Sequence, residues 1–294
     1  MSAPVLAAVD PVALDAAPAR FAALAAGHAG TTLVVVAVYG DDEAIDPLPA
    51  GQLGEGLARD ATPAFAVAAQ AADEVGVSAE TLAVAATSPP RGIELAAAQL
   101  GAALLVVGSS AGGKPDRVAR GSTAARLLCG APCGVAVVPT GWEPGHGLTT
   151  VATGFVDTLE GRAALRSAHA LAARAGARLR VLAALQRQPW MNGPTEDELR
   201  ARAENAAEAA ASGLLGAPVD IDVEIGNPAA YLLDASAEVD VLVCGGRGYG
   251  AAETVFQGGV TREVTAAARC PVIVLPRGVT APIEPLFAQA VSAA

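Results

Sequence analysis

The sequence predicts an α/β protein built from two tandem Rossmann-like domains, each a five-stranded parallel sheet with helices on both faces. Short β-branched apolar runs alternate with alanine-rich segments, which is typical of parallel strands joined by right-handed helical crossovers. A length of 294 residues suits two domains of roughly 100–200 residues each. The pattern also occurs twice, at a distance of 137 residues. The matched positions are Gly108 and Gly245, Gly121 and Gly258, Cys133 and Cys270, and Pro139 and Pro276.

The first half contains five predicted strands and four predicted helices. Thr31–Tyr39 is continuously apolar and β-branched, as expected for a strand covered on both faces. A polar loop with glycine and proline follows it, over Gly40–Gly56. The strands are predicted at Val5–Val9, Thr31–Tyr39, Thr81–Ala85, Leu104–Val107 and Val135–Val138. The helices are predicted at Leu14–Ala26, from near Pro63 to residue 75, at Ile93–Leu100 and at Ser122–Cys129.

The second half repeats this order. In the earlier part of each copy, equivalent positions are about 146 residues apart. Thr195 and the acidic residues after it are a favourable start for its longest helix. The strands are predicted at Val151–Phe155, Arg178–Leu185, Val219–Ile225, Val241–Cys244 and Val272–Leu275. The helices are predicted at Gly161–Ala175, Thr195–Leu215, Pro228–Ala235 and Thr261–Ala268.

The domain boundaries follow from the Pro/Gly-rich stretch Pro139–Gly147, which includes Trp142 and reads as a linker. We expect domain 1 at residues 1–140, the linker at 141–148, domain 2 at 149–277 and an apolar tail at 278–294 that forms a short helix packed on the body.

Composition narrows the classes of partner. A net charge of −11 argues against nucleic acid, which requires a basic face. No apolar run reaches the roughly 18 residues of a membrane span, and the N-terminus lacks the basic region of a secretory signal. We therefore expect a cytoplasmic protein with no membrane partner. The cysteines and histidines do not have metal-site spacing, so we expect no metal site and buried cysteines. These are Cys129, Cys133, Cys244 and Cys270.

The glycine clusters after the fourth strand of each half are the candidate ligand loops. Glycine lets the backbone approach a ligand closely, and the helix that follows offers free amides to a phosphate. Neither loop contains the P-loop motif GxxxxGK[ST]. In the first loop, Gly113 and Lys114 are followed by proline rather than by serine or threonine. Gly246, Gly248 and Ala251 fit a dinucleotide fingerprint nominally, but that fingerprint belongs after the first strand with an acidic partner.

Both halves resemble the universal stress protein (UspA) family. The resemblance rests on VLAAVD at residues 5–10, the turn Gly226–Ala229, the GxxG-x₉-G[ST] form of the loops, and CPVIVLP at residues 270–276. It covers nearly the whole chain and implies a Rossmann-like tandem member that binds ATP or AMP in stress adaptation, with Mg²⁺ able to accompany the nucleotide. Since family members often pair through their last strands, the resemblance also implies that Val135–Val138 and Val272–Leu275 pair, which makes the chain an intra-chain pseudo-dimer and hides two sheet edges. A homodimer of two such chains is compatible with this arrangement. Catalysis is not implied, and no His, Lys or carboxylate constellation for a general base stands beside either loop.

In the first half the resemblance places Asp10 near the ribose or adenine, and the backbone of Val38 against the adenine. Asp10 has an alternative role as a helix cap. The loop departs from the family pattern at Ala111, where alanine replaces the second glycine, at a cost of about 1 kcal/mol if that position needs a positive φ. The predicted site residues of this half are Asp10, Val38, Gly108, Ala111, Gly121, Ser122 and Thr123.

In the second half the glycines are complete, but two other features depart from the family. Gly259 replaces the serine or threonine, and Val156 occupies the aspartate position while Asp157 lies one residue later. The predicted site residues are Gly245, Arg247, Gly248, Gly258, Gly259 and Val260. These departures leave two functions open: an adenine-nucleotide-binding regulator, or a degenerate, nucleotide-free member that acts as an interaction or structural module. An ATPase is the third and weakest alternative.

Overall fold

The computed structural model describes residues 3–11, 14–40, 55–109, 123–145, 147–186, 194–246, 259–276 and 283–287. Ala111, Gly121, Ser122, Arg247, Gly248 and Gly258 lie outside these ranges, as do most of the predicted Gly40–Gly56 loop and part of the tail.

Ten strands form one continuous sheet, in the order β3-β2-β1-β4-β5-β10-β9-β6-β7-β8. Within each half all neighbouring strands are parallel. Five strands belong to the first half: β1 Val5–Val9, β2 Leu33–Gly40, β3 Ala79–Ala86, β4 Leu104–Gly108 and β5 Gly134–Val138. Five belong to the second half: β6 Thr150–Phe155, β7 Arg178–Leu185, β8 Val219–Ile225, β9 Val241–Gly246 and β10 Val272–Pro276.

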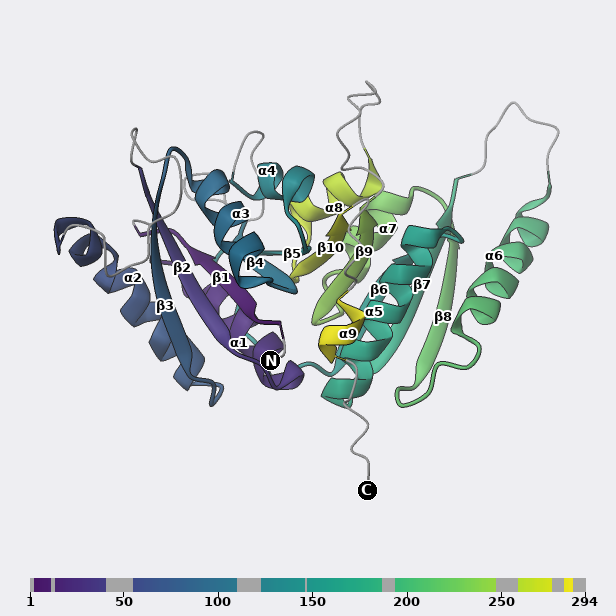
Figure 1. Cartoon of the computed structure of the whole chain (residues 1–294). Helices are drawn as coiled ribbons and strands as arrows, with labels where there is room; N and C mark the ends of the chain where they lie inside the picture. The colour runs from purple at the N-terminus through teal and green to yellow at the C-terminus, as the bar shows by residue number, and fades with distance from the viewer. Residues whose placement is uncertain are drawn as a thin grey trace.

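The two halves meet where β5 and β10 pair antiparallel. Ile273 lies opposite Ala136, with Val272 opposite Val137 and Val274 opposite Val135. Figure 1 shows the halves on either side of this central pair. The pairing confirms the predicted intra-chain pseudo-dimer, and each strand hides an edge that would otherwise expose unpaired backbone groups.

Helices cover both faces of the sheet (Figure 1). One face carries α1 Ala17–Ala29, α2 Glu55–Asp73, α5 Leu159–Ala175, α6 Glu196–Ala211 and the short α9 Glu284–Phe287. The other carries α3 Pro89–Leu100, α4 Thr123–Gly130, α7 Pro228–Ala235 and α8 Val260–Ala267. The hydrophobic core on each face includes side chains from both halves, so the two domains share their cores. Among the described residues, no helix combines the length and apolar character needed to cross a membrane.

Two helix starts differ from the predictions for a local reason. The first helix begins at Ala17 rather than Leu14, because Pro18 lies in its first turn. Proline lacks the N–H needed inside a helix, and its ring would clash with the carbonyl four residues earlier. The second half has Ala164 at the position of Pro18, and α5 begins at Leu159 rather than the predicted Gly161. The loop after β1 is therefore longer than its counterpart after β6.

Other predictions also need correction. The longest predicted helix of the second half ends at Ala211 rather than Leu215, and the glycine that follows, Gly213, adopts φ +85°. Pro63 lies inside α2 rather than at its entry. Cys129 is exposed, whereas the other three cysteines are buried as predicted. Its neighbours Leu127 and Leu128 fill the buried side of α4, which turns Cys129 outward.

The segment that follows the last strand of each half packs onto the first helix of that half. After β5, the ring of Trp142 meets Phe21 of α1 edge-on, with ring centroids 5.6 Å apart. After β10, Ile283 and Phe287 are buried, and Arg166 of α5 forms an ion pair with Glu284 at 3.0 Å. The C-terminal helix thus packs on the body, as predicted, and the linker tryptophan packs there as well.

Candidate functional site

A cleft of about 320 Å³ opens in the second half at the carboxyl ends of β6, β7 and β9. The crossover after β6 runs through α5 on one face of the sheet, and the crossover after β9 runs through α8 on the other. Parallel sheets bind ligands at such a switch point, because the diverging crossovers leave a crevice. The lining residues are Gly154, Phe155, Val156, Glu160, Gly161, Leu182, Ala184, Pro228, Leu232, Cys244, Gly245, Gly259, Val260 and Thr261.

Three helices contribute their first turns to this cleft. Gly161 lies in the first turn of α5, Pro228 begins α7, and Val260 begins α8. The positive dipole end of a helix favours an anion. The side chains of Thr158 and Asn227 cap N–H groups of α5 and α7, whereas α8 has no side-chain cap, so its first N–H groups are the ones suited to a phosphate.

The walls of the cleft are otherwise mostly apolar. Phe155, Leu182 and Leu232 supply large side chains, and a β-carbon on Gly154 would approach Leu232 Cδ1 to 3.0 Å. Burial raises the pKa of the Cys244 thiol to about 12, so it is protonated at neutral pH. Glu160 is the acidic side chain among the lining residues. An apolar wall beside helix ends suits a flat, apolar base joined to an anionic group.

Three of the predicted site residues of the second half line this cleft. They are Gly245 at the end of β9, and Gly259 and Val260 at the start of α8. A β-carbon on Gly245 would lie 3.0 Å from the carbonyl oxygen of Glu160, so the glycine permits a close approach of β9 to α5. The hydroxyl of Thr261 donates to the carbonyl of Gly245 at 3.0 Å, which ties the start of α8 to the end of β9.

The position of the family aspartate is also on this cleft, but it carries no carboxylate. Val156 lines the opening with 46% of its surface exposed. Asp157 is not a lining residue; its carboxylate accepts a hydrogen bond from Arg162 Nε at 2.7 Å, and this bond lowers the pKa of Asp157. Asp157 is therefore an ion-paired surface residue and not a substitute for Asp10 in this cleft.

In the first half, the predicted residues that the structure describes lie together at the carboxyl ends of that half's own strands. Val9 lies opposite Ala37, so β2 extends beyond β1 at Val38, and Asp10 follows β1 at an exposed position. Gly108 ends β4, which also neighbours β1. Thr123 begins α4 in the next crossover. The side chain of Val38 is buried against α3, where a β-carbon on Gly92 would lie 2.7 Å from Val38 Cγ1.

The profile of the universal stress protein family matches residues 1–139 and again residues 150–276. The chain belongs to the universal stress protein family. Universal stress protein Rv2319c of Mycobacterium tuberculosis and Mb2346c of Mycobacterium bovis are each 31% identical to it over 192 residues, which cover 60% of this chain. The match spans 65% of the length of these relatives.

Two solved structures share the tandem fold along nearly the full length of this universal stress protein. A putative universal stress protein from Pseudomonas aeruginosa superimposes with a TM-score of 0.68 at 18% identity, covering 98% of both chains. A universal stress protein from Archaeoglobus fulgidus gives a TM-score of 0.66 at 18% identity, covering 94% of this chain and 96% of that one. At this identity the similarity establishes the fold.

Several lining residues were missed by the sequence-based prediction, although the repeat could have found one of them. Equivalent residues in this part of the two halves, such as Val9 and Phe155, are 146 positions apart. The same offset makes Ala184, which lines the cleft, the equivalent of the predicted site residue Val38. Phe155, Leu182 and Leu232 read as ordinary core residues in the sequence. Only the packing of α5 and α7 around the strand ends shows that they border a cleft.

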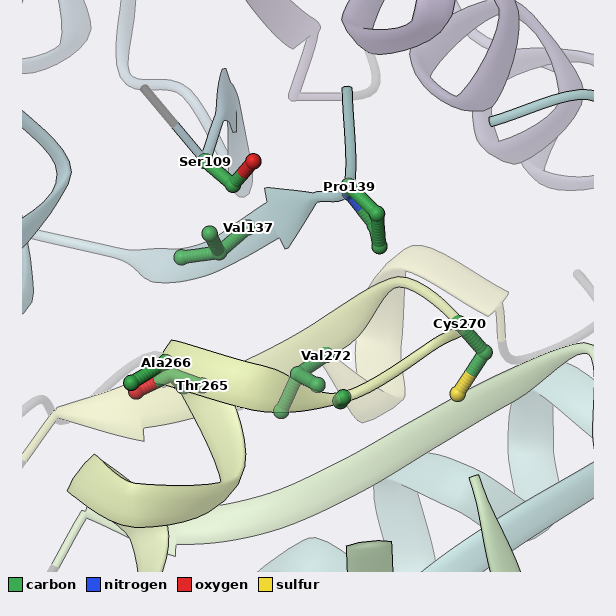
Figure 2. Close-up of a pocket in the computed structure, with 8 residues that line it drawn as sticks. Ser109, Val137, Pro139, Thr265, Ala266, Cys270 and Val272 are labelled. Atoms are coloured by element: carbon green, nitrogen blue, oxygen red, sulfur yellow. The ribbon is translucent and has the colours of Figure 1, made fainter. Parts of the chain in front are cut away.

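A second hollow in this universal stress protein lies between the halves and is far smaller, about 10 Å³. Figure 2 shows Ser109, Val137 and Pro139 of the first half on one side and residues of the second half, including Cys270 and Val272, on the other. This volume is about that of one water molecule, so it cannot hold a nucleotide. Within the described ranges, no three His, Cys, Asp or Glu side chains gather closely enough to hold a metal ion.

Proposed function

We propose that this universal stress protein binds an adenine nucleotide, ATP or AMP, in at least one of its two domains and acts as a regulator in stress adaptation. The observation that carries the proposal is the cleft at the ends of β6, β7 and β9, where the first turns of α5, α7 and α8 converge. Its volume of about 320 Å³ falls in the range of about 300–1,000 Å³ typical of small-molecule sites.

The residues of the second-half cleft fit the phosphate and base better than the ribose. Gly245 and Gly259 leave the backbone open to close approach, and the apolar walls suit a base. Val156 offers no carboxylate to a ribose hydroxyl. In the first half, Asp10 and Thr123 keep the polar side chains that the second half lacks at Val156 and Val260. Mg²⁺ would enter with the phosphates, since hard cations bind phosphate oxygens.

We also propose binding without catalysis. The titratable side chains among the described lining residues are Glu160 and Cys244. Because Cys244 is a protonated thiol at neutral pH, it is a poor nucleophile. Phosphate release by the purified protein, above that of a Gly108→Val, Gly245→Val double variant, would contradict this proposal.

Isothermal titration calorimetry with ATP and with AMP tests the function directly. Gly245→Val should weaken binding in the second half, because its β-carbon would press on the backbone of Glu160. Gly108→Val should weaken binding in the first half, where the β-carbon would lie 3.3 Å from Pro18 Cγ. The binding stoichiometry of the two variants then assigns the occupied domain. No heat with either nucleotide, and no nucleotide released on denaturation of the purified protein, would refute the proposal.

A nucleotide-free interaction module is the second candidate, and specific contacts favour it. The carboxylate of Asp157 is taken by Arg162, and the hydroxyl of Thr261 is taken by the carbonyl of Gly245. Neither group therefore compensates for Val156 or Gly259. Restoring the family residues with Ala111→Gly and Val156→Asp distinguishes the two functions. A gain in ATP affinity supports a weakened nucleotide site, whereas no gain supports the module.

The remaining assignments are proposals of the same kind. We propose boundaries at residues 140, 148 and 277, a cytoplasmic location, and no nucleic-acid or membrane partner, consistent with the net charge of −11. Light scattering coupled to size exclusion would show whether two chains associate into a homodimer.

A further inference from the structure

The linker between the two domains touches both loops that border the first-half site. Its residues Thr140, Gly141 and Trp142 follow β5 directly. Over these three positions the linker contacts the loop after β4, the loop after β1, and helix α1. We call Thr140–Trp142 the linker strut.

The first contact of the strut is with Ser109, which immediately follows Gly108. The hydroxyl of Ser109 accepts a hydrogen bond from the backbone N–H of Thr140 at 3.2 Å, and it lies 3.3 Å from the Thr140 hydroxyl. The backbone N–H of Ser109 donates to the carbonyl of Val138 at 2.8 Å. Ser109 is 5% exposed. These bonds fix the first residue after β4 to the start of the linker.

The second contact is with Asp15, in the loop that follows Asp10. Oδ1 of Asp15 accepts from the backbone N–H of Ala17 at 3.0 Å and from that of Gly141 at 3.4 Å. The same carboxylate thus binds the start of α1 and the linker strut. The preceding Leu14 has φ +50°, an uncommon conformation for a residue with a side chain. The backbone therefore turns at Leu14, immediately before the residue that binds the linker.

The third contact is hydrophobic. Trp142 packs edge-on against Phe21 of α1 at 5.6 Å, and the adjacent Glu143 lies 3.7 Å from Arg20. Trp142 therefore sits one residue beyond the two hydrogen-bonded positions of the strut. Its indole ring reports on the packing of the linker against the first domain.

The second domain lacks the side chains for these contacts. Ser109 corresponds to Gly246 at the distance of 137 residues, and Asp15 corresponds to Gly161 at the distance of 146 residues. Helix α5 is capped instead within its own loop, by Thr158. Since the second domain forms the same fold without a side chain at either position, the contacts of Ser109 and Asp15 are not a requirement of the fold.

We propose that Ser109 and Asp15 are positioning residues for the first-half nucleotide site, and that through the linker strut they couple occupancy of that site to the packing of Trp142. The proposal rests on the proposed function, because it needs a nucleotide in the first domain. A ligand bound at Gly108 and Asp10 contacts the two loops that the strut holds. If the ligand binds more tightly to the conformation in which the strut contacts are formed, then by linkage the loss of those contacts must lower the affinity of the site for the ligand.

The test uses a Trp190→Phe, Gly245→Val background, in which Trp142 is the single tryptophan and binding in the second half should be weakened. ATP is titrated by calorimetry and by tryptophan emission in parallel. Ser109→Ala and Asp15→Ala, which each remove the accepting oxygen, should each weaken ATP binding by about threefold to tenfold, the range expected for one hydrogen bond. Both should also reduce the emission change at saturating ATP, and Ser109→Thr should restore both.

A matched control removes a comparable contact far from the first domain. Thr195→Ala deletes the hydroxyl that accepts from the N–H of Glu198 at the start of α6. It should leave both the affinity and the emission change as they are. Thermal unfolding by circular dichroism confirms that each variant is folded.

The possible failures can be told apart. If calorimetry detects ATP binding but Trp142 emission does not respond, or if Ser109→Ala and Asp15→Ala bind as tightly as the background, the coupling is wrong and the proposed function stands. If no nucleotide binds to the background or to the unmodified protein, the proposed function fails and the coupling fails with it.

Discussion

The α-carbon of Gly161 faces the carbonyl oxygen of Val156 so closely that a β-carbon at position 161 would lie 1.9 Å from that oxygen. Both residues line the second-half cleft. The contact arises because α5 begins at Leu159, soon after β6 ends at Phe155. The turn must therefore fold back on the first turn of the helix, and only glycine leaves room for the carbonyl.

Gly161→Ala should lower the free energy of unfolding by about 1–3 kcal/mol, because the new methyl group overlaps the Val156 carbonyl and the turn must shift. Urea denaturation measures the loss. Gly226→Ala is the matched control, since its β-carbon would have only an ordinary 3.6 Å contact with Glu224. Equal stability of the two variants would show that the β6–α5 turn is free to relax.

The junction between the halves should be sensitive to its central residue. Ile273 is fully buried and lies opposite Ala136 in the antiparallel pair. Ile273→Ala should lower the free energy of unfolding by about 2–5 kcal/mol, through lost burial and a residual cavity. Leu159→Ala, at a side chain 85% exposed, should change it by less than about 0.5 kcal/mol. A small effect of Ile273→Ala in urea denaturation would argue against the β5–β10 pair.

Two helix starts at equivalent places should respond differently to alanine. Asn227 Oδ1 accepts from the N–H groups of Ala229 and Ala230 at 2.9 and 3.2 Å, whereas Ser88 forms no side-chain cap for α3. Asn227→Ala should therefore cost about 0.5–2 kcal/mol of stability, and Ser88→Ala should cost little. Thermal unfolding of the two variants, measured side by side, compares the two losses of stability. A larger loss for Ser88→Ala than for Asn227→Ala would contradict the prediction.

The cysteines should differ sharply in reactivity. Burial raises the pKa of Cys133, Cys244 and Cys270 to about 12, while Cys129 is exposed. Thiolates react and thiols do not, and at pH 8 only about one in ten thousand of the buried groups is ionised. Iodoacetamide at pH 8 should therefore add one label to the folded protein, detectable by mass spectrometry, and none to Cys129→Ser. Denatured protein should take four labels, and rapid labelling of a buried cysteine before unfolding would refute the burial.

The same pKa values predict a loss of stability at high pH. A thiol whose pKa is about 12 when folded and lower when unfolded keeps its proton longer in the folded protein. The unfolded chain releases its protons first, so the stabilisation is complete below pH 9 and is lost between pH 9 and 12. The free energy of unfolding, measured by urea denaturation across this window, should fall less steeply in Cys244→Ala than in the unmodified protein.

Much of the fold could be predicted because it is encoded locally. The strands are short apolar runs with distinct ends, and the predicted bounds of Arg178–Leu185, Val219–Ile225 and Pro228–Ala235 are those of β7, β8 and α7. The position of Gly108 and Gly245 at strand ends follows from the same pattern. The late start of α1 was also encoded, in Pro18, but the helical content around it concealed the break.

The sequence by itself determined that this protein is a duplicated α/β chain and where each strand lies, because periodicity and repetition are properties of neighbouring residues. Only the tertiary structure decided that Phe155, Leu182 and Leu232 border one cleft, and that Asp15 meets Gly141 across 126 positions of sequence. Such contacts depend on how helices close over the strand ends and on the path of the linker. No local pattern specifies them, since each joins segments that approach only after the sheet has formed.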